Sequence, residues 1–427
     1  MPFPTSALLD TDRIGVEMKN KINAHFADAS QHGSGSSLAV VTNVAALKAL
    51  TGVADGEHRL LSGYYAPADG GGGIVRRNSG SSATVDDGMV FSSADGGRWE
   101  RVWDRGPLRA IWYGLKVGNL TDDAAPKIKK AHNYIVASGQ PGVVLLPAGR
   151  LLWNTAITWD MSYVSLHGNS TTFEVPSTFT GTALKITGTR NPPYDQGHTY
   201  MAYIEFDGPA VGVGTCIRLE SATSDGPSQL GFYGLNIRNW SHGIEWYTGA
   251  YCNNFISCSI HDCTVCVFFV NGGTNYGERM TFTGCDMYNS QTAIRADGNA
   301  AFFHFVQCSF DYCWQIVNSG SPIQFASCHF EQARDTKNLV PIITSGTEAH
   351  FAFDSCMFVM TNRGGAPTYP VYVNATSLGS ASSGIVAFSK CKYWGIRTTS
   401  GNFAAGSRVF SQYPSYHDVG TTRFPGA

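Results

Sequence analysis

The segment Phe303-His304-Phe305-Val306-Gln307-Cys308-Ser309-Phe310 contains the pattern on which the fold of this chain depends. A phenylalanine is followed three residues later by a cysteine, and a large apolar residue comes two positions after the cysteine. This pattern occurs six times in the second half of the chain, which indicates a structural repeat. The six units are Phe255/Cys258/Ile260, Phe282/Cys285/Met287, Phe305/Cys308/Phe310, Phe325/Cys328/Phe330, Phe353/Cys356/Phe358 and Phe388/Cys391/Tyr393.

The spacing of the units predicts a solenoid. Successive cysteines are 27, 23, 20, 28 and 35 residues apart, which is about one coil with inserted loops of variable length. Another apolar residue usually stands two positions before the phenylalanine, as in a strand with one buried face. The step of three from phenylalanine to cysteine requires a bend, so each unit contains two short strands that meet at a corner. We therefore predict an all-β chain built around a right-handed, single-stranded parallel β-helix, in which phenylalanines and cysteines stack from coil to coil. A β-sandwich would not require one residue type to recur at one place in every unit.

The composition excludes several kinds of partner. Charged residues make up 15% of the 427 residues and the formal net charge is -2, so we expect neither nucleic acid binding nor membrane insertion. All 11 cysteines lie between Cys216 and Cys391, and their odd number and regular positions favour core packing over a disulfide framework. Cys263 and Cys266 have the spacing of half a zinc site, but no second pair follows, so we predict no metal and no cofactor.

The first part of the chain divides into two segments. Residues 1–37 contain one expected helix, Asp12–Ala29, and a Gly/Ser-rich linker. Residues 38–106 contain closely spaced turn signals between short apolar runs, which predicts a small β-rich domain. The N-terminus lacks the pattern of a secretory signal and no long apolar run is present, so we expect a soluble protein made in the cytoplasm.

A helix is predicted at about residues 121–138, at the beginning of a β-helix that spans residues 107–427. Thr121-Asp122-Asp123 has the character of an N-cap with acidic residues in the first turn, and Pro126 suits that turn. The helix is expected to end at Gly139 and to be followed by a buried strand and a turn. The apolar positions of the helix are Ala124, Ile128, Ala131 and Ile135.

Several of these motifs resemble bacteriophage tailspike and tail fibre proteins of the pectate-lyase-like parallel β-helix superfamily. The motifs Val41-Thr42-Asn43-Val44-Ala45-Ala46-Leu47, Gly63-Tyr64-Tyr65, Asp69-Gly70-Gly71-Gly72-Gly73 and Gly96-Gly97-Arg98-Trp99-Glu100-Arg101 are similar to the particle-proximal domain of phage tailspikes. Thr121-Asp122-Asp123 and Leu146-Pro147-Ala148-Gly149 are similar to the start of phage β-helices. The chain departs from the family at Pro126 and at Leu151-Leu152, where an aromatic residue is usual.

The resemblance implies a function and a set of partners. It implies a homotrimer located in the virion, at the phage tail, and assembled in the cytoplasm of the bacterial host. Attachment would use residues 1–37 and the particle-binding domain to reach the tail, the baseplate or another tail protein. The β-helix would bind bacterial capsule or O-antigen polysaccharide and cleave it. The resemblance does not assign catalytic residues.

The repeat itself places candidate catalytic residues. If the cysteine and the residue two positions later face inward, the residues one and three positions after the cysteine form two outward columns. One column is Ser259, Asp286, Ser309, His329, Met357 and Lys392, and the other is His261, Tyr288, Asp311, Glu331, Val359 and Trp394. Asp311 and Glu331 are one coil apart and should lie about 4.8 Å apart. This is close to the separation of about 5 to 5.5 Å found in retaining glycosidases.

Two like charges at this distance do not ionise together, so one carboxyl group should keep its proton. We assign Glu331 as the general acid and Asp311 as the nucleophile or base. Asp286, one coil earlier, is an alternative to either and would give a wider pair and an inverting reaction. Glu278 precedes a strand of the same region and is a further candidate acid.

Aromatic and imidazole side chains near these acids are candidate substrate-binding residues. We expect Tyr288, Tyr312, Trp314 and Trp394 to stack on sugar rings, and His329 and His261 to form hydrogen bonds. The alternatives are that the acids are ordinary solvated surface residues and that the aromatic residues form contacts between copies of the chain.

Four functions remain open on these grounds. The first is a hydrolytic polysaccharide depolymerase, an endo-glycosidase that works through paired carboxylates. A polysaccharide lyase is a variant, but the scarcity of Lys and Arg around the acids disfavours an anionic sugar. The third is a non-catalytic receptor-binding or structural tail protein. A secreted bacterial carbohydrate enzyme is the fourth, and the missing secretory signal argues against it.

Overall fold

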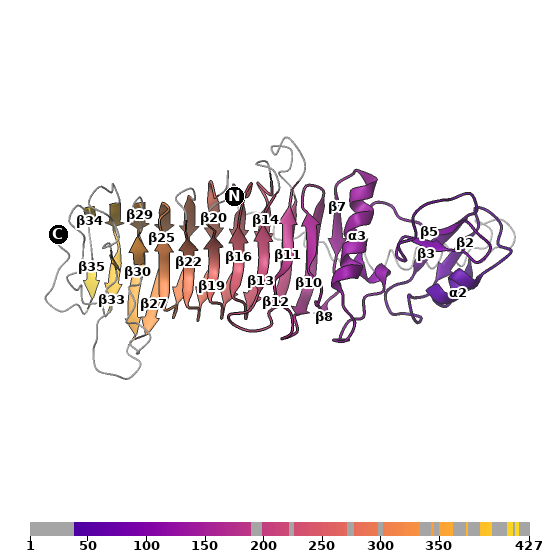
Figure 1. The fold of residues 1–427 in the computed structure, drawn as a ribbon, viewed down its shortest axis with the longest axis horizontal. Coiled ribbons are helices and arrows are strands. Elements are labelled where there is room, and N and C mark those ends of the chain that lie inside the picture. The colour runs from indigo at the N-terminus through magenta and orange to yellow at the C-terminus, as the bar shows by residue number, and fades with distance from the viewer. Residues whose placement is uncertain are drawn as a thin grey trace, which may run out of the picture. The chain divides into compact units, whose positions relative to one another are not determined.

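A computed structural model shows the chain as two compact units, Met1–Trp103 and Asp104–Ala427 (Figure 1). The predicted helix Asp12–Ala29 lies outside the described residues. Within the described part of the chain, no helix has the length and apolar character needed to cross a membrane. The structure describes residues 38–188, 199–221, 226–270, 277–297, 302–333, 343–345, 350–361, 373–374, 385–394, 408–412 and 415–417.

The first unit contains a five-stranded sheet with the strand order β1-β2-β3-β5-β4, which confirms the predicted small β-rich domain. Its core includes Trp99 and Phe91, both fully buried. A short helix, α2, was not expected, and Asn43 caps it by accepting a hydrogen bond from the amide of Ala46 at 2.8 Å. The bounds are β1 (Ala39–Val41), α2 (Val44–Ala49), β2 (His58–Leu61), β3 (Gly73–Asn78), β4 (Val90–Ser92) and β5 (Arg98–Arg101).

The glycine-rich motif of this unit is a turn organised by one carboxylate. Asp69 accepts hydrogen bonds from the amides of Tyr64, Tyr65, Ala66 and Gly71 at 2.7 to 3.1 Å. Burial raises the pKa of Asp69, but these backbone donors outweigh it and the net shift is downward. A side chain at Gly71 would lie 2.5 Å from Cβ of Tyr64, which explains the glycine.

The second unit begins with the predicted amphipathic helix, now α3 (Ala125–Ser138), whose apolar positions are buried and which ends at Gly139 with φ 67°. The expected acidic first turn is wrong, because Asp122 and Asp123 precede the helix. Asp123 pairs instead with Leu152 in a β-bridge, and its carboxylate accepts hydrogen bonds from the amides of Ala125 and Asn154. The helix therefore begins after Asp123, which belongs to a β-bridge and not to the helix.

The rest of the second unit is a parallel β-helix, as predicted, but each regular coil has three strands and not two (Figure 1). The third strands form a separate nine-stranded parallel sheet, which the sequence pattern did not reveal. The first strands are β14 (Gly231–Tyr233), β17 (Asn254–Ile256), β20 (Met280–Thr283), β23 (Phe303–Val306), β26 (Ile323–Ala326), β29 (His350–Asp354), β32 (Ile385–Ser389) and β34 (Arg408–Gln412). The second strands are β15 (Asn236–Arg238), β18 (Ser259–His261), β21 (Asp286–Tyr288), β24 (Ser309–Asp311), β27 (His329–Ala333), β30 (Met357–Thr361), β33 (Lys392–Trp394) and β35 (Ser415–His417).

The earliest coils have longer strands. β10 pairs with both β7 and β8, and β12 pairs with both β14 and β15, so each of them covers the first and second positions of its coil. The third strands are β9 (Ile157–Asp160), β11 (Thr182–Thr187), β13 (Thr215–Leu219), β16 (His242–Trp246), β19 (Val265–Phe269), β22 (Thr292–Ala296), β25 (Gln315–Ser319), β28 (Ile343–Ser345) and β31 (Val373–Asn374). The remaining elements are β6 (Leu108–Arg109), the 3-10 helix η1 (Ala110–Tyr113), β7 (Gly142–Leu145), β8 (Gly149–Leu152), β10 (Val164–Glu174) and β12 (Tyr200–Asp207).

The six repeat units stack in register, as the sequence predicts. Each repeat phenylalanine pairs with the phenylalanine of the next coil, and neighbouring rings are stacked with centroids 4.7 to 5.3 Å apart. The column is Phe255, Phe282, Phe305, Phe325, Phe353 and Phe388. All six phenylalanines are buried, so the column forms a continuous part of the core.

The bend between phenylalanine and cysteine is a residue in the left-handed region, with φ between 52° and 57°. It reverses the side-chain parity, so both repeat residues point inward. The six bend residues are Ser257, Gly284, Gln307, Ser327, Ser355 and Lys390.

The cysteines serve as small core residues. All 11 are free, and ten of them are buried. The thiol of Cys308 donates to the carbonyl oxygen of Phe282 in the preceding coil at 3.4 Å, and the other ladder cysteines make similar contacts. A seventh unit, Phe232/Leu235/Ile237, has leucine in the cysteine position, so the cysteine pattern did not reveal it.

Truncation in the phenylalanine column should destabilise the β-helix strongly. We expect Phe305→Ala to cost about 3–5 kcal/mol, because it leaves a cavity between two stacked rings. The exposed Gln324→Ala, in the next coil, should change stability by less than about 0.5 kcal/mol. Thermal and denaturant unfolding of both variants measures the difference, and equal stability would contradict a shared aromatic core.

Candidate functional site

The outward side chains of the second strands form the two predicted columns. The pairings place Asp286, Ser309 and His329 in one column and Tyr288, Asp311 and Glu331 in the other. We call this surface the second-strand face. From β15 to β33 its described outward residues are Asn236, Arg238, Ser259, His261, Asp286, Tyr288, Ser309, Asp311, His329, Glu331, Met357, Val359 and Lys392.

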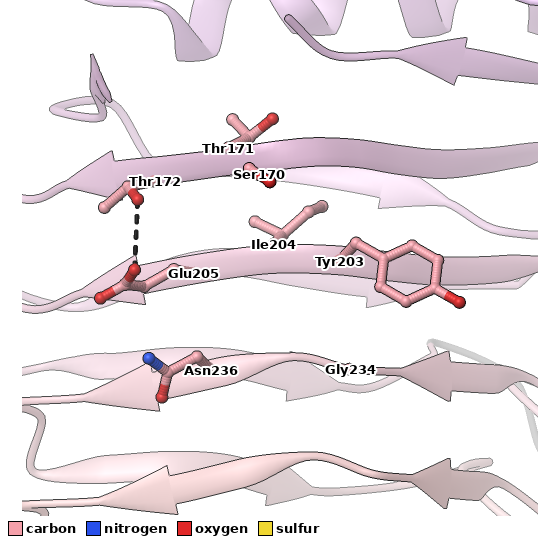
Figure 2. Close-up of a pocket in the computed structure, with 8 residues that line it drawn as sticks. All are labelled: Ser170, Thr171, Thr172, Tyr203, Ile204, Glu205, Gly234 and Asn236. Carbon is pink, nitrogen blue, oxygen red and sulfur yellow. Dashed lines mark hydrogen bonds between the residues drawn. The ribbon is translucent and has the colours of Figure 1, made fainter. Parts of the chain in front are cut away.

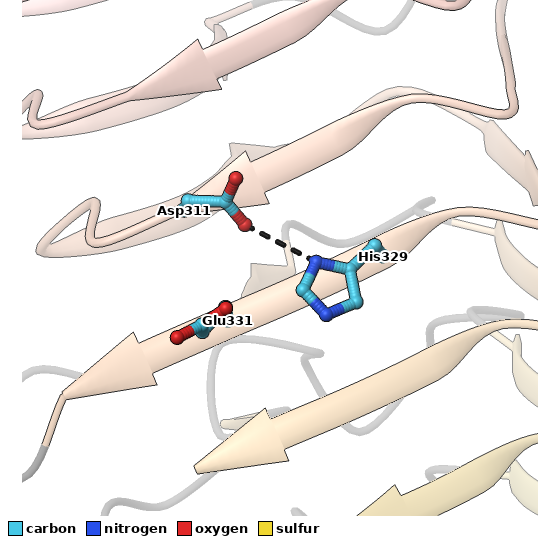
Figure 3. Close-up of side chains that lie close together, drawn as sticks. All are labelled: Asp311, His329 and Glu331. Carbon is cyan, nitrogen blue, oxygen red and sulfur yellow. Dashed lines mark hydrogen bonds and ion pairs between the residues drawn. The ribbon is translucent and has the colours of Figure 1, made fainter. Parts of the chain in front are cut away.

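Asp311, His329 and Glu331 form a compact group on β24 and β27 (Figure 3). Nδ1 of His329 lies 3.3 Å from Oδ1 of Asp311. The Ser309 hydroxyl donates to the other oxygen of Asp311 at 2.8 Å. One side-chain ligand atom from each of the three residues lies within 4.8 Å of the others, so the two carboxylates are as close as the coil spacing predicts.

The surroundings of Asp311 raise the pKa of its carboxyl group. Burial raises its pKa, and the nearby Glu331 carboxylate acts in the same direction. Hydrogen bonding from Ser309 and the proximity of His329 act in the opposite direction but do not cancel the rise. The pKa of Asp286 is also raised, first by burial and then by Asp311.

Glu331 has a different partner. The hydroxyl of Tyr312 donates to Oε1 of Glu331 at 2.5 Å. This contact holds one Glu331 oxygen in a fixed position. Tyr312 reaches it from a corner at which its own φ is 57°. The raised pKa of Asp311 favours this residue as the proton donor of the pair, which is the reverse of the roles assigned from sequence.

A hollow of about 290 Å³ lies beside these residues. It is lined by Tyr288, Asn289, Asp311 and Tyr312, so it brings a candidate acid together with two candidate stacking residues. Such a mixture of aromatic and polar groups suits a ligand with both apolar and hydroxyl-bearing surfaces.

The same three residues are also a possible metal site. Asp311, His329 and Glu331 are the one group of at least three His, Cys, Asp or Glu side chains among the described residues whose ligand atoms lie this close together. Their oxygen and imidazole ligands would suit a divalent cation. The charge of a cation would also compensate the two carboxylates.

Two other candidate residues, Tyr288 and His261, contact each other beside this group. Tyr288 stacks on His261 with ring centroids 4.3 Å apart and planes 8° apart. The ring nitrogens of His261 contact Asp262 and Asn236 at 2.7 and 3.1 Å, and the residue is buried. Its position suits support of Tyr288 rather than direct hydrogen bonding to a ligand.

The remaining candidates are not part of the group. Glu278 precedes the first strand of its coil, is 63% exposed and lies 3.4 Å from Arg279. Trp314 is 41% exposed and lies two residues beyond Tyr312. The backbone of Trp394 pairs with Val359, and its side chain lies outside the described residues.

A second hollow on this surface was missed by the sequence analysis. It has a volume of about 280 Å³ and lies where β10, β12 and the β14–β15 corner meet (Figure 2). Its lining includes Tyr203, Glu205 and Asn236. The cysteine of the Tyr203 coil, Cys216, is in the third strand and not at the ladder position, so the repeat pattern could not extend the outward columns this far. The pairing of β12 with β15 supplies the connection.

The raised pKa of Asp311 predicts a pH-dependent stability difference. The folded chain binds the Asp311 proton more tightly than the unfolded chain does. Proton binding therefore adds to the free energy of unfolding below the ordinary carboxyl pKa, and this contribution is lost as pH rises through the raised pKa of Asp311. Asp311→Asn should therefore melt at a higher temperature than the parent at pH 7, and the difference should disappear near pH 3. Melting curves across this range measure it. A variant less stable than the parent at pH 7 would contradict this environment for Asp311.

Comparison with known proteins adds to these observations. Residues 40–104 match the family of phage tail protein small four-stranded β-sheet domains. The enzymatically active domain of bacteriophage CBA120 tailspike protein 4 is 20% identical, with a TM-score of 0.63; the match covers 92% of this chain and 56% of that one. The tailspike protein of Acinetobacter phage vB_ApiP_P1 is 17% identical, with a TM-score of 0.63, over 89% of this chain and 72% of that one.

A third similar structure is the tailspike protein of Acinetobacter baumannii bacteriophage Fri1, described as a capsular polysaccharide depolymerase. It is 15% identical, with a TM-score of 0.53, over 89% of this chain and 76% of that one. At these identities the structural similarity establishes the fold. The chain therefore combines a domain of the phage tail protein family with a parallel β-helix of the fold found in bacteriophage tailspike proteins.

Proposed function

We propose that this chain is a tailspike subunit that binds a bacterial surface polysaccharide, capsule or O-antigen, and hydrolyses it at Asp311 and Glu331. The observation that carries the proposal is the pair of carboxylates within 4.8 Å in unlike environments. Hydrolysis of a glycosidic bond needs one carboxyl group that gives a proton and one that stays anionic. The phage tail domain at residues 40–104 and the depolymerase described for the similar Fri1 tailspike support the virion location and the substrate class.

The proposed reaction has two steps. In the first, Asp311 gives its proton to the glycosidic oxygen, and a Glu331 oxygen attacks the anomeric carbon as the bond to that oxygen breaks. In the second, the Asp311 carboxylate takes a proton from water, the water oxygen attacks the anomeric carbon, and Glu331 leaves as a carboxylate. Tyr312 holds Glu331 in place, and Ser309 and His329 hold Asp311.

The wider assembly follows from the resemblance to tailspikes. We propose a homotrimer that attaches to the phage tail, the baseplate or another tail protein through residues 1–37 and the small domain. A non-catalytic receptor-binding or structural tail protein is the alternative. The lyase variant has less support, because the acidic second-strand face would repel the uronic acid that a lyase requires.

Substitution of the two carboxylates tests the proposal. Purified capsular and O-antigen polysaccharides are incubated with the full chain, and new reducing ends are measured. We expect Asp311→Asn and Glu331→Gln each to lower the rate by about 10²- to 10⁴-fold. Asp297→Asn, an exposed carboxylate paired with Arg295 on a third strand, should leave the rate unchanged. Variants that cut as fast as the parent would eliminate this site.

Two additional results would redirect the proposal. Retention of a polysaccharide by the parent without new reducing ends would favour the receptor-binding alternative. Loss of cleavage on treatment with a chelator, restored by a divalent cation, would show that Asp311, His329 and Glu331 act through a metal.

The short carboxylate separation also predicts the stereochemistry. We expect the first-formed reducing sugar to retain the anomeric configuration of the substrate, because the pair is too close to admit a water molecule between acid and base. Proton NMR of the product, recorded before mutarotation, measures it. Inversion would transfer one of the two roles to Asp286.

A further inference from the structure

The hollow around Tyr203 is built into the fold (Figure 2). The pairing of β10 with β12 shifts register between His167 and Thr171, which opens the surface at this point. The next coil has Gly234 at the corner, and a Cβ there would lie 3.0 Å from the ring of Tyr203. The hollow therefore exists because Gly234 has no side chain and because the register between β10 and β12 shifts.

Tyr203 occupies a conformation that does not suit its side chain. Its φ is 57°, a left-handed value that bulky residues rarely adopt, and its side chain is 57% exposed. The equivalent corner holds Ser170 in the coil before and Gly234 in the coil after. His167 contacts the ring edge-on, with centroids 5.4 Å apart. Residues retained at such positions often have a functional reason.

The same irregularity occurs at the candidate active site. Among described residues with positive φ, only Tyr203 and Tyr312 are aromatic. Each of them lines one of the two hollows on this surface. Tyr312 stands in a corner column that otherwise holds Asn239, Asp262 and Asn289, which adopt this conformation more readily.

The polar groups around Tyr203 suit an uncharged ligand. The hydroxyl of Thr172 donates to Glu205 at 3.2 Å, and the amide side chain of Asn236 lies on the neighbouring strand (Figure 2). Arg238 lies 3.1 Å from Glu205 and 2.8 Å from Asp207, so one guanidinium is shared by two carboxylates. The remaining negative charge disfavours an anionic sugar here. Hydroxyl, amide and aromatic groups together can bind the hydroxyls and the apolar face of a sugar ring.

The two hollows lie along one continuous surface. Asn236, Ser259, Asp286 and Ser309 follow one another in register, so β15 and β24 are separated by three inter-strand steps, or about 14 Å. His261 connects the two hollows, because it contacts Asn236 of the first and stacks on Tyr288 of the second. A single sugar does not span this distance, but an oligosaccharide does.

We propose that the Tyr203 hollow is a second saccharide-binding subsite, which holds an uncharged sugar unit of the polysaccharide that reaches Asp311 and Glu331. The bound polymer then runs along the axis of the β-helix, across the coils. This inference rests on the proposed polysaccharide binding, but it does not require cleavage.

Binding measurements on the full chain test the subsite. An array of purified bacterial capsular and O-antigen polysaccharides is probed in the Asp311→Asn background, which prevents cleavage. We expect Tyr203→Ala and Tyr203→Gly to weaken binding about tenfold through loss of aromatic stacking, and Tyr203→Phe to retain it. Ile256→Ala, an exposed apolar residue on a first strand, is the matched control and should bind like the parent.

The glycine variant separates function from structure. Glycine accepts positive φ without strain, so Tyr203→Gly should not lower the melting temperature even though it weakens binding. Unchanged binding by Tyr203→Ala and Tyr203→Gly would overturn the subsite, as would an array in which the parent retains no polysaccharide. Parent binding without cleavage would overturn the hydrolysis alone, because the subsite is judged by binding.

Cleavage assays in the parent background provide a second measurement. Tyr203→Ala should slow cleavage of the polymer but not of fragments too short to reach from Asp311 to the hollow. An equal effect on both lengths would indicate a general disturbance of the coil and would overturn the subsite.

Discussion

In-register stacking of parallel coils around a column of buried aromatic rings is the constraint on which the rest of this structure depends. The phenylalanine rings lie 4.7 to 5.3 Å apart, close to the spacing of neighbouring strands, so ring packing and backbone hydrogen bonding require the same register. A shift of one residue would expose the rings and bury the polar columns. The same register therefore fixes the neighbours of every outward side chain.

This constraint turns distant residues into a site. Asp311 and Glu331 are 20 residues apart in sequence and face each other across one inter-strand step. Stacking makes such a pair electrostatically unfavourable, and the burial of Asp311 adds to the cost. The packing of the core fixes the register of the coils, and this register keeps the two carboxylates close together despite their electrostatic repulsion. A solenoid suits this purpose, because each coil is fixed by its neighbours on both sides.

Two aromatic residues adopt a backbone conformation that bulky side chains rarely adopt, and both lie at the proposed binding surface. Many bends of the coils have Ser, Gly, Asn or Asp, and others have Gln307 or Lys390, but Tyr203 and Tyr312 are the two aromatic residues with positive φ in the described part of the chain. Both tyrosines line hollows on the second-strand face. Arg238 forms ion pairs with Glu205 and Asp207, whereas the ion pair found at Asp311 among the described residues is with His329.

The sequence by itself determined the solenoid, the inward phenylalanine and cysteine columns and the pairing of Asp311 with Glu331, because a period and a side-chain parity are properties of the chain alone. It did not reveal the third strand of each coil, because the recurring feature there, a small buried residue followed by Leu, Ile or Val, is less specific than paired Phe and Cys. It also did not reveal the coil of Tyr203, where no cysteine stands at the ladder position. It also placed Asp122 and Asp123 inside α3, although Asp123 bonds to residues near Asn154 that only folding brings close. The hollows, the hydrogen-bond partners and the raised pKa of Asp311 arise only in the folded chain, because they depend on burial and on contacts between coils.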